Sequence, residues 1–346
     1  MMNKLHTFLC ICGLALTSLL CQAATQADGG RIFLQHQGII AHSYAPADMA
    51  KAIEQAAEGD TLLLSNGTYP SQFTINKSIS IIGTDASYIS CLNNNDCIVL
   101  KSATTDSLRV HLENLNTTSS NGLRIELYND MEDGRYYTLS HPVKIFLHKS
   151  RILEFRTSNA DIVGADIQCH RCIITYMTNL REPAKATLEN CELMNLGECD
   201  NIQANHCYIK SIQQIDNSLI ANSIIGSISS KGYDGNEGTA SSIISNSLYN
   251  GTDQKYALQN SFLIKENLLG ATIPFTCKFN KSQLEANSYF GTDGTVMGVL
   301  GGNVPSNVTD EATLLSPANR PQISNGSVNW DESKKKVRVN AKVTAK

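Results

Sequence analysis

The chain is poor in aromatic and charged residues. Aromatic side chains make up 6% of its 346 residues, with one tryptophan, and charged side chains make up 17%. So few aromatic residues argue against a β-sandwich core, although the length allows one large core. The formal net charge of -4 creates no overall basic field, which disfavours nucleic acid as a partner.

Long apolar runs are missing outside the first residues. The run at 7–20 follows Lys4, precedes small residues and is too short for a comfortable membrane span, which is typical of a secretory signal peptide. We expect 1–24 to be removed and the protein to be secreted, periplasmic or on the outer cell surface, with no transmembrane segment. Lipoprotein anchoring at Cys21 is the alternative, disfavoured because Leu20 is bulky.

Cysteine is plentiful. Three of the 11 cysteines lie in the expected signal peptide, which leaves 11 − 3 = 8 in an oxidising compartment where disulfides form. Cys91 and Cys97 bracket the polar loop CLNNNDC and are the best disulfide candidates. Cys169 and Cys172 have the spacing of zinc ligands, but a second CxxC is missing, which disfavours zinc.

The first structured segment combines a helix with strands. PADMAKAIEQAAEGD places Met49, Ile53 and Ala56 at helical spacing and ends near Gly59. TLLLSNGTYPSQFTINKSISIIG then contains short β runs divided by turn residues. We therefore expect one helix at about 46–58, followed by a long series of strands.

This opening resembles the pectin-lyase-like right-handed parallel β-helix proteins. In those proteins a helix caps the open end of the solenoid, and a segment like GDTLLLSNGTY begins the first coil. The resemblance implies an all-β fold, a single-stranded right-handed parallel β-helix with an N-terminal capping helix. It indicates an architecture more than an activity.

One short pattern returns along the chain, an Asn followed by a small Ser or Cys between apolar residues, as in LENCEL and LQNSFL. After the first copy the spacings are 22, 19, 16, 16, 24, 14 and 27 residues, close to one coil of a β-solenoid. The central positions are Asn114, Lys149, Arg171, Asn190, His206, Asn222, Asn246, Asn260 and Asn287.

Coils of a parallel solenoid stack at about 4.8 Å, so equivalent side chains fall into register. We expect the Asn residues to form a corner column that tolerates left-handed backbone and hydrogen-bonds from coil to coil. The small residue that follows should point inward. Cys172, Cys191 and Cys207 would then be buried, unpaired and stacked. Asn217 with Ser218 is an extra copy without an assigned coil.

The tail departs from the repeat. GTDGTVMGVLGGNVPSNV resembles the ending of secreted β-helix proteins common in Bacteroidetes, mostly without established activity, in which such a segment closes the solenoid before a final strand pair. We expect the β-helix at 31–290 and a C-terminal cap at 291–346. The alternating strand at 337–343 should lie over the open end and block edge pairing.

Motifs of several polysaccharide enzymes with this fold are absent. The chain has no Asp-Asp pair and no Gly-His-Gly, which excludes polygalacturonase-type hydrolysis. The WxDH and RxPxxR of pectate lyases and the DxxFG of pectin methylesterases are missing as well. A polysaccharide lyase that needs only a Lys and an Arg on adjacent coils stays open.

The Asn column is interrupted at two successive positions. Lys149 and Arg171 replace Asn there, and His148 and His170 precede them. In a β-elimination, Arg171 would neutralise a uronate carboxylate and Lys149 or His170 would take the C5 proton. The alternative is that long basic side chains merely cover a corner.

Two acidic residues flank this basic patch. Glu113 and Glu189 occupy the position of the two histidines on the flanking coils. We expect both acids, with His148, to contact an anionic sugar.

The insert YNDMEDGRYY is a second candidate site. Asp130, Glu132 and Asp133 are weak calcium ligand candidates, because they lack the alternate spacing of known calcium loops. Tyr136 and Tyr137 are candidates for stacking on sugar rings. No other cofactor is expected.

These patterns predict a secreted or cell-surface β-helix protein that binds an acidic polysaccharide or cell-surface glycan and cleaves it, if it is an enzyme, by β-elimination. The alternative is a non-catalytic surface solenoid that acts as an adhesin or structural protein. We expect a monomer.

Overall fold

The computed structural model describes residues 30–84, 87–90, 97–101, 107–117, 124–128, 142–157, 164–231, 241–251, 256–303, 305, 322–331 and 336–344. The chain divides into two compact units, Met1–Ile167 (unit 1) and Gln168–Lys346 (unit 2). Both are built mainly from parallel strands, which confirms the predicted all-β parallel β-helix.

Unit 1 begins with a short antiparallel part and continues as parallel coils. Its strands are β1 (Ile32–His36), β2 (Ile39–Tyr44), β3 (Thr61–Leu64), β4 (Gly67–Pro70), β5 (Phe73–Ile75), β6 (Ile79–Ile82), β7 (Ser87–Ser90), β8 (Cys97–Lys101), β9 (Leu108–Glu113), β10 (Asn116–Thr117), β11 (Arg124–Tyr128), β12 (Val143–His148) and β13 (Arg151–Thr157). One sheet has the order β2-β1-β3-β6-β9-β12, the second β5-β8-β11-β13 and the third β4-β7-β10. Only β1 pairs antiparallel, with β2 and β3, within these described sheets.

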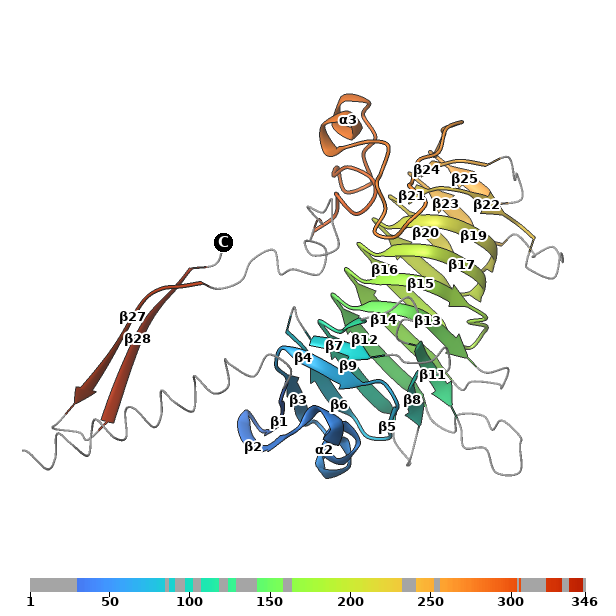
Figure 1. The fold of residues 1–346 in the computed structure, drawn as a ribbon. Helices are drawn as coiled ribbons and strands as arrows, with labels where there is room; N and C mark the ends of the chain where they lie inside the picture. The colour runs from blue at the N-terminus through green and yellow to red at the C-terminus, as the bar shows by residue number, and fades with distance from the viewer. Residues whose placement is uncertain are drawn as a thin grey trace, which may run out of the picture. The chain divides into compact units, whose positions relative to one another are not determined.

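The predicted helix is present near the start of unit 1. A 3-10 turn, η1 (Pro46–Asp48), leads into α2 (Met49–Gln55), which contacts β1 and β5 (Figure 1). The Lys77 ammonium donates to the Glu54 and Ala56 carbonyls at 2.9 and 2.8 Å, where a helix end leaves acceptors free. The helix buries the side chains of Met49, Ala52 and Ile53.

Unit 2 repeats the same coil more regularly. Its strands are the end of β14 (Ala165–His170), β15 (Ile173–Thr178), β16 (Lys185–Glu189), β17 (Glu192–Asp200), β18 (Ile202–Asn205), β19 (Tyr208–Asp216), β20 (Leu219–Ala221), β21 (Ile224–Ile225), β22 (Ile228–Ser229), β23 (Ile243–Ser245), β24 (Leu248–Tyr249), β25 (Ala257–Gln259) and β26 (Phe262–Leu263). One sheet runs β16-β18-β20-β23-β25 and the other β15-β17-β19-β21-β24-β26. These strands follow one another from green to yellow in Figure 1.

The core of unit 2 is a stack of aliphatic side chains in register. Leu193, Ile209 and Ile225 pair across β17, β19 and β21, and each is 0% exposed. Because alternate residues of a strand share a face, the residues that precede them, Glu192, Tyr208 and Ile224, lie on the opposite face, where they are also buried. Each buried aliphatic side chain stabilises the fold by about 1.5–3 kcal/mol relative to an exposed one.

The predicted corner column has left-handed backbone in eight of its nine positions. Asn190 and His206, for example, have φ of 50° and 51°. The N–H of Asn190 donates to the Asn205 carbonyl of the next coil at 3.1 Å. Asn287 is the exception, since it follows helix α3 (Lys281–Ala286) with φ of −90°, so its assignment to the column is wrong.

The small residues after this column form the ladder between coils. Ser223 Oγ accepts the Cys207 N–H at 3.0 Å and donates to the Ala221 carbonyl at 2.6 Å, and Ser247 Oγ accepts the Ser223 N–H at 3.0 Å. Cys191 Sγ receives the N–H of the preceding coil's cysteine at 3.5 Å. The main-chain N–H at this buried corner needs an acceptor on the next coil. A small side chain with an acceptor atom supplies one, which explains why Ser and Cys recur here.

The extra copy at Asn217 belongs to a second corner, between β19 and β20. Asn217 also has positive φ, at 49°. Ser218 Oγ accepts the Ile202 N–H at 3.0 Å, and the Ser218 N–H donates to Ser242 Oγ at 3.1 Å. The solenoid therefore uses the same small-residue ladder at two of its edges.

Six cysteines, all in unit 2, are free thiols. Burial raises the pKa of Cys169, Cys191 and Cys207, and it raises that of Cys199 to about 12. The predicted stack of buried, unpaired cysteines is confirmed. Cys91 lies outside the described residues, so its pairing with Cys97 stays a prediction. The free thiols are Cys169, Cys172, Cys191, Cys199, Cys207 and Cys277.

The parallel strands end at Leu263, earlier than the expected boundary at 290. The chain at 264–303 contains α3 and packs against the coils of unit 2, with Phe275, Met297 and Val299 in a buried apolar cluster. Farther on, β27 (Gln322–Asp331) and β28 (Lys336–Thr344) form the expected strand pair, and their pairing is antiparallel. Its position over the open end stays a prediction.

Replacing Ser223 by Ala should lower the free energy of unfolding by about 1–3 kcal/mol, because the buried Cys207 N–H loses its acceptor. Urea unfolding at fixed pH measures the change. Ser245→Ala, on the outward face of β23, is the matched control and should leave stability nearly unchanged. Equal losses in both variants would contradict the ladder.

Alkylation of the native protein should spare Cys191 and Cys207, because burial removes them from solvent and disfavours their thiolates. Peptide mapping after labelling with iodoacetamide, before and after denaturation, measures this. A Cys172 to Cys191 cross-link in the non-reduced map would overturn the inward stack.

Candidate functional site

Strands β9 and β12 of unit 1 carry a compact set of outward side chains. Both strands alternate buried apolar residues with more exposed ones, so one side of each strand faces away from the core. The parallel register fixes which of these outward side chains are neighbours. The pairs are Arg109 with Lys144, His111 with Phe146 and Glu113 with His148, together called the outward grid below.

Glu113 is the acidic member of the outward grid. Its carboxylate lies 3.3 Å from His148 Nδ1 and 3.6 Å from His111 Nε2. The hydrogen bond with His148 lowers the pKa of Glu113; burial opposes the shift, and the charges of His148, His111 and Lys149 favour it. Burial lowers the pKa of His111. The carboxylate is thus already engaged by two imidazoles.

Arg109 and Lys144 are cations in directly opposite positions. Within the described part of the chain neither of them forms an ion pair with a carboxylate. Like charges placed opposite each other in a sheet are destabilising. Phe146 lies two residues beyond Lys144 on the same face and is 38% exposed. An uncompensated pair of cations beside an exposed ring suits an anionic ligand with an apolar face.

Unit 2 contains a second pair of the same kind. His170 Nδ1 lies 3.2 Å from a carboxylate oxygen of Glu189, and both side chains are partly exposed. The predicted matching of acidic and histidine positions is therefore present in each unit. Lys149 lies in unit 1 and Arg171 in unit 2, so the basic patch that would combine them stays a prediction.

Arg171 is buried, contrary to its expected role. It is 4% exposed, burial lowers its pKa, and its Nε atom has no hydrogen-bond partner among the described residues. A guanidinium that solvent hardly reaches is not placed to neutralise the carboxylate of an incoming uronate. This burial weighs against Arg171 as the cation of a β-elimination, and its catalytic role stays a prediction.

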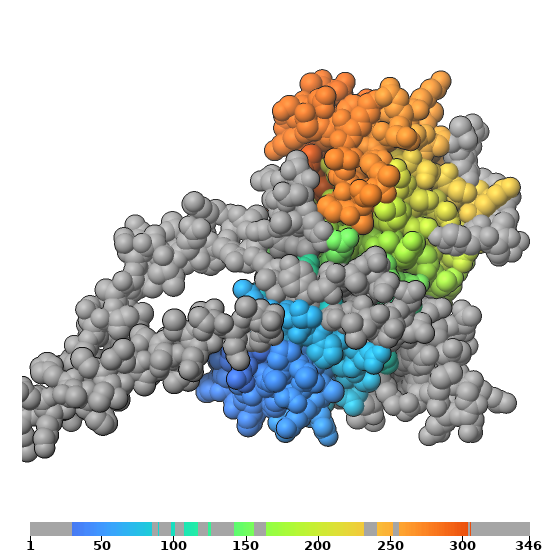
Figure 2. All heavy atoms as spheres, in the orientation of Figure 1, coloured from blue at the N-terminus to red at the C-terminus, as the bar shows by residue number. Residues whose placement is uncertain are grey.

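The corner column of unit 2 is covered by a segment at 291–302, called the strap below. The Thr292 N–H donates to Asn222 Oδ1 at 2.9 Å, and Asp293 Oδ2 lies 3.0 Å from His206 Nε2. Figure 2 shows the orange atoms of the C-terminal segment against the coils. Asn222 Nδ2 also donates to Asn205 Oδ1 on the preceding coil at 2.8 Å, so an Asn side-chain bond between coils, as expected, is present beside the strap contacts.

Asn190 continues the same contact on the preceding coil. Its Nδ2 donates to the Gly301 carbonyl at 2.8 Å. A Cβ at Gly301 would overlap the Val296 carbonyl oxygen, and one at Gly298 would overlap the Tyr208 ring. These close contacts explain why glycine recurs in DGTVMGVLGG. The sequence indicated that this segment ends the solenoid, but it did not show which residues the segment contacts.

Glu192 is a buried carboxyl beneath the segment that leads to the strap. It is 2% exposed, and its Oε2 accepts the Phe275 N–H at 2.7 Å. Burial raises its pKa to about 7, and the Phe275 N–H partly opposes the shift. Nothing in the local pattern around Glu192 distinguished it from a solvated outward residue.

The second candidate site of the sequence, Asp130, Glu132, Asp133, Tyr136 and Tyr137, lies outside the described residues. Its roles in calcium and sugar binding stay predictions. Among the residues that are described, no group of three or more His, Cys, Asp or Glu side chains could hold a metal ion.

Comparison with protein-family models gives no match, and comparison with curated proteins gives none either. The parallel β-helix fold is present, but the resemblance to pectin-lyase-like proteins in any further respect stays a prediction. No described helix combines the length and apolar character needed to cross a membrane.

Replacing Glu192 by Gln should remove part of the pH dependence of stability. Because its pKa rises from 4.5 to about 7 on folding, the contribution of the protonated carboxyl is complete below 4.5 and is lost as pH rises through 7. Glu192→Gln should match wild type near pH 4.5 and exceed its free energy of unfolding by up to about 3 kcal/mol at pH 8.

Urea unfolding across this pH range measures the difference. Glu285→Gln on α3 is exposed and serves as the control, which should retain the wild-type pH profile. A Glu192→Gln profile parallel to wild type would contradict the buried, protonated carboxyl.

Proposed function

We propose that the protein binds an acidic polysaccharide on the outward grid and does not cleave it. The observation that carries this proposal is the opposed pair Arg109 and Lys144, without an ion pair among the described residues, beside the exposed ring of Phe146. The expected signal peptide would take the protein to the compartment where such polymers are found.

The chemistry of the outward grid fits an anionic sugar. A carboxylate or sulfate between Arg109 and Lys144 would relieve their repulsion and accept charge-assisted hydrogen bonds, each contributing about 1.5–3 kcal/mol. The Phe146 ring would contact the apolar face of a sugar. His111 and His148 supply ring nitrogens for hydroxyl groups. Together these groups recognise both the charge and the ring of an acidic sugar.

The same geometry favours binding over bond cleavage. A β-elimination needs a free base near the C5 proton and a cation near the carboxylate. His170, one of the two expected bases, lies 3.2 Å from a Glu189 carboxylate oxygen, and Lys149, the other, takes part in an interaction within the protein. Arg171, the expected cation, is buried. A non-catalytic glycan-binding solenoid is therefore the function supported best.

The double variant Arg109→Gln with Lys144→Gln should bind polygalacturonate and chondroitin sulfate at least about tenfold more weakly than wild type, a loss of about 1.4 kcal/mol or more. Titration calorimetry with the full mature chain measures this, with dextran as the neutral polymer. Wild-type affinity should also fall as salt rises.

Lys265→Gln with Lys281→Gln removes two exposed cations of unit 2 and is the charge-matched control. Equal affinity of the folded Arg109/Lys144 double variant and wild type would refute the proposed site. Release of unsaturated, ultraviolet-absorbing products from polygalacturonate would show cleavage and refute the binding-only role.

A further inference from the structure

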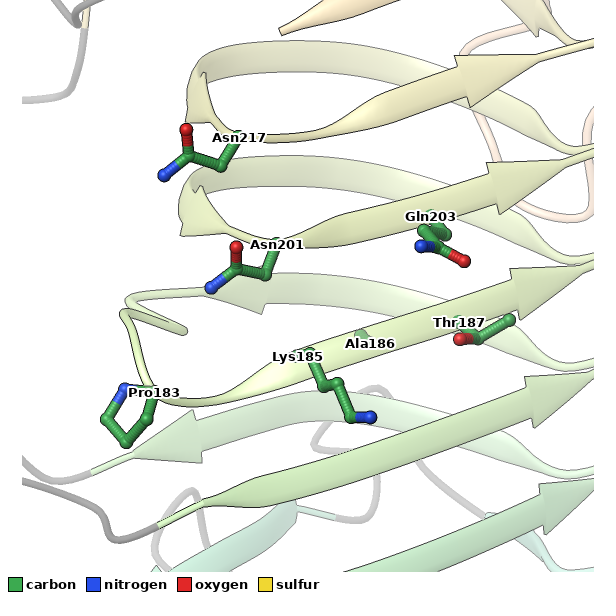
Figure 3. A pocket seen from close by; sticks show the side chains of 7 residues that line it. All are labelled: Pro183, Lys185, Ala186, Thr187, Asn201, Gln203 and Asn217. Carbon is green, nitrogen blue, oxygen red and sulfur yellow. The ribbon is translucent and has the colours of Figure 1, made fainter. Parts of the chain in front are cut away.

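Unit 2 has a hollow of about 290 Å³ on the outward face of the sheet that contains β16 and β18 (Figure 3). It lies wholly within unit 2 and is separate from the outward grid of unit 1. Its lining is mostly neutral and polar. The lining residues are Pro183, Lys185, Ala186, Thr187, Asn201, Gln203 and Asn217.

Two hydrogen bonds to the Asp200 carboxylate hold one wall of the hollow in place. Asp200 accepts from Arg181 at 3.2 Å with one carboxylate oxygen and from the Glu182 N–H at 3.1 Å with the other. These bonds fix the turn that carries Pro183, whose ring stands at the edge of the hollow in Figure 3. These bonds are formed within the protein, so the position of this wall does not depend on a ligand.

Above Pro183, the same edge carries amides on the next two coils (Figure 3). Asn201 and Asn217 both have left-handed backbone, with φ of 56° and 49°, so their side chains leave equivalent corners. Asn201 donates to the Ala184 carbonyl at 3.4 Å, and the Asn217 side-chain oxygen accepts from Ser241 at 3.1 Å. These bonds orient the amides and leave the Asn201 oxygen and the Asn217 N–H groups for a ligand.

The floor adds groups that both donate and accept. Thr187 and Gln203 are directly opposite in the parallel register of β16 and β18, and both are exposed. Neither side chain forms a hydrogen bond with another described residue. Lys185 does take part in an interaction within the protein, so the hollow does not present a free cation.

We propose that this hollow binds a neutral hexopyranose, either as a free sugar or as one unit of a glycan chain. Sugar hydroxyls both donate and accept, which matches the Thr187 hydroxyl and the Gln203 and Asn217 amides. The Pro183 ring would lie against the apolar C–H face of the sugar. A hexopyranose suits a hollow of this volume, slightly below the usual range for drug-sized ligands.

Saturation-transfer difference NMR on the full mature chain tests this proposal with glucose, galactose and mannose as the probes. Wild type should transfer saturation to the ring protons of at least one of them. Thr187→Trp, which fills the hollow, and Gln203→Leu, which removes its floor amide, should reduce that signal at least about fivefold.

The matched control is Gln259→Leu, on the same outward face in β25 but outside the hollow, which should leave the signal unchanged. The grid variant Arg109→Gln with Lys144→Gln should also keep it, so the two sites can fail separately. Melting temperatures within a few degrees of wild type confirm folding of each variant. No transfer from wild type to any of the three sugars, or equal signals in the hollow variants and the control, would overturn the proposal.

Discussion

Hydrogen bonding between successive coils is the constraint on which the rest of this structure depends. Each interior parallel strand uses both edges for main-chain bonds, so its neighbours are fixed in register and equivalent side chains stack. The stack of Leu193, Ile209 and Ile225 is one result. The inward Ser and Cys ladder is another, because a polar atom at this buried corner must be satisfied by the next coil. Serine supplies a stronger acceptor than cysteine, and both are small enough for the corner.

The left-handed corner explains the preference for asparagine and also its exceptions. Asn adopts positive φ at little cost, and yet Lys149, Arg171 and His206 take the same conformation. In unit 2 the corner side chains have a further role, because the strap bonds to Asn190, His206 and Asn222 in turn. His206 supplies a ring nitrogen for Asp293 where asparagine would not reach in the same way. The contact with Asp293 thus accounts for one departure from the Asn repeat, at His206.

The outward faces are where this fold is free to vary. An outward residue satisfies no coil-to-coil requirement, so the same scaffold carries the cations of the outward grid and the amides of the hollow. The grid arises because RVHLE and KIFLH lie in register on neighbouring strands. The hollow arises because Asp200 holds the turn that carries Pro183 beside strands β16 and β18. Both sites depend on rigid neighbours that the solenoid supplies.

The sequence by itself determined the repeating elements of this protein. Helical spacing marked α2, alternation marked the strands, and the Asn and Ser or Cys pattern marked the corners, because these features depend on residues close together in the chain. It also placed Glu113 opposite His148, since a regular coil converts spacing into register. Arg109, His111, Lys144 and Phe146 carry the same alternation but were not among the predicted site residues, because alternation alone does not distinguish a binding residue from any other outward residue.

Only the tertiary structure decided what covers each outward residue. The strap contacts join residues 70, 87 and 111 positions apart, and the Glu192 contact with Phe275 joins residues 83 apart. Local spacing contains no information about such pairs, because they depend on where a non-repeating segment folds back. For that reason the burial of Arg171 and the raised pKa of Glu192 could not be predicted. Desolvation acts through the final packing, whereas the period of the solenoid is present in the chain itself.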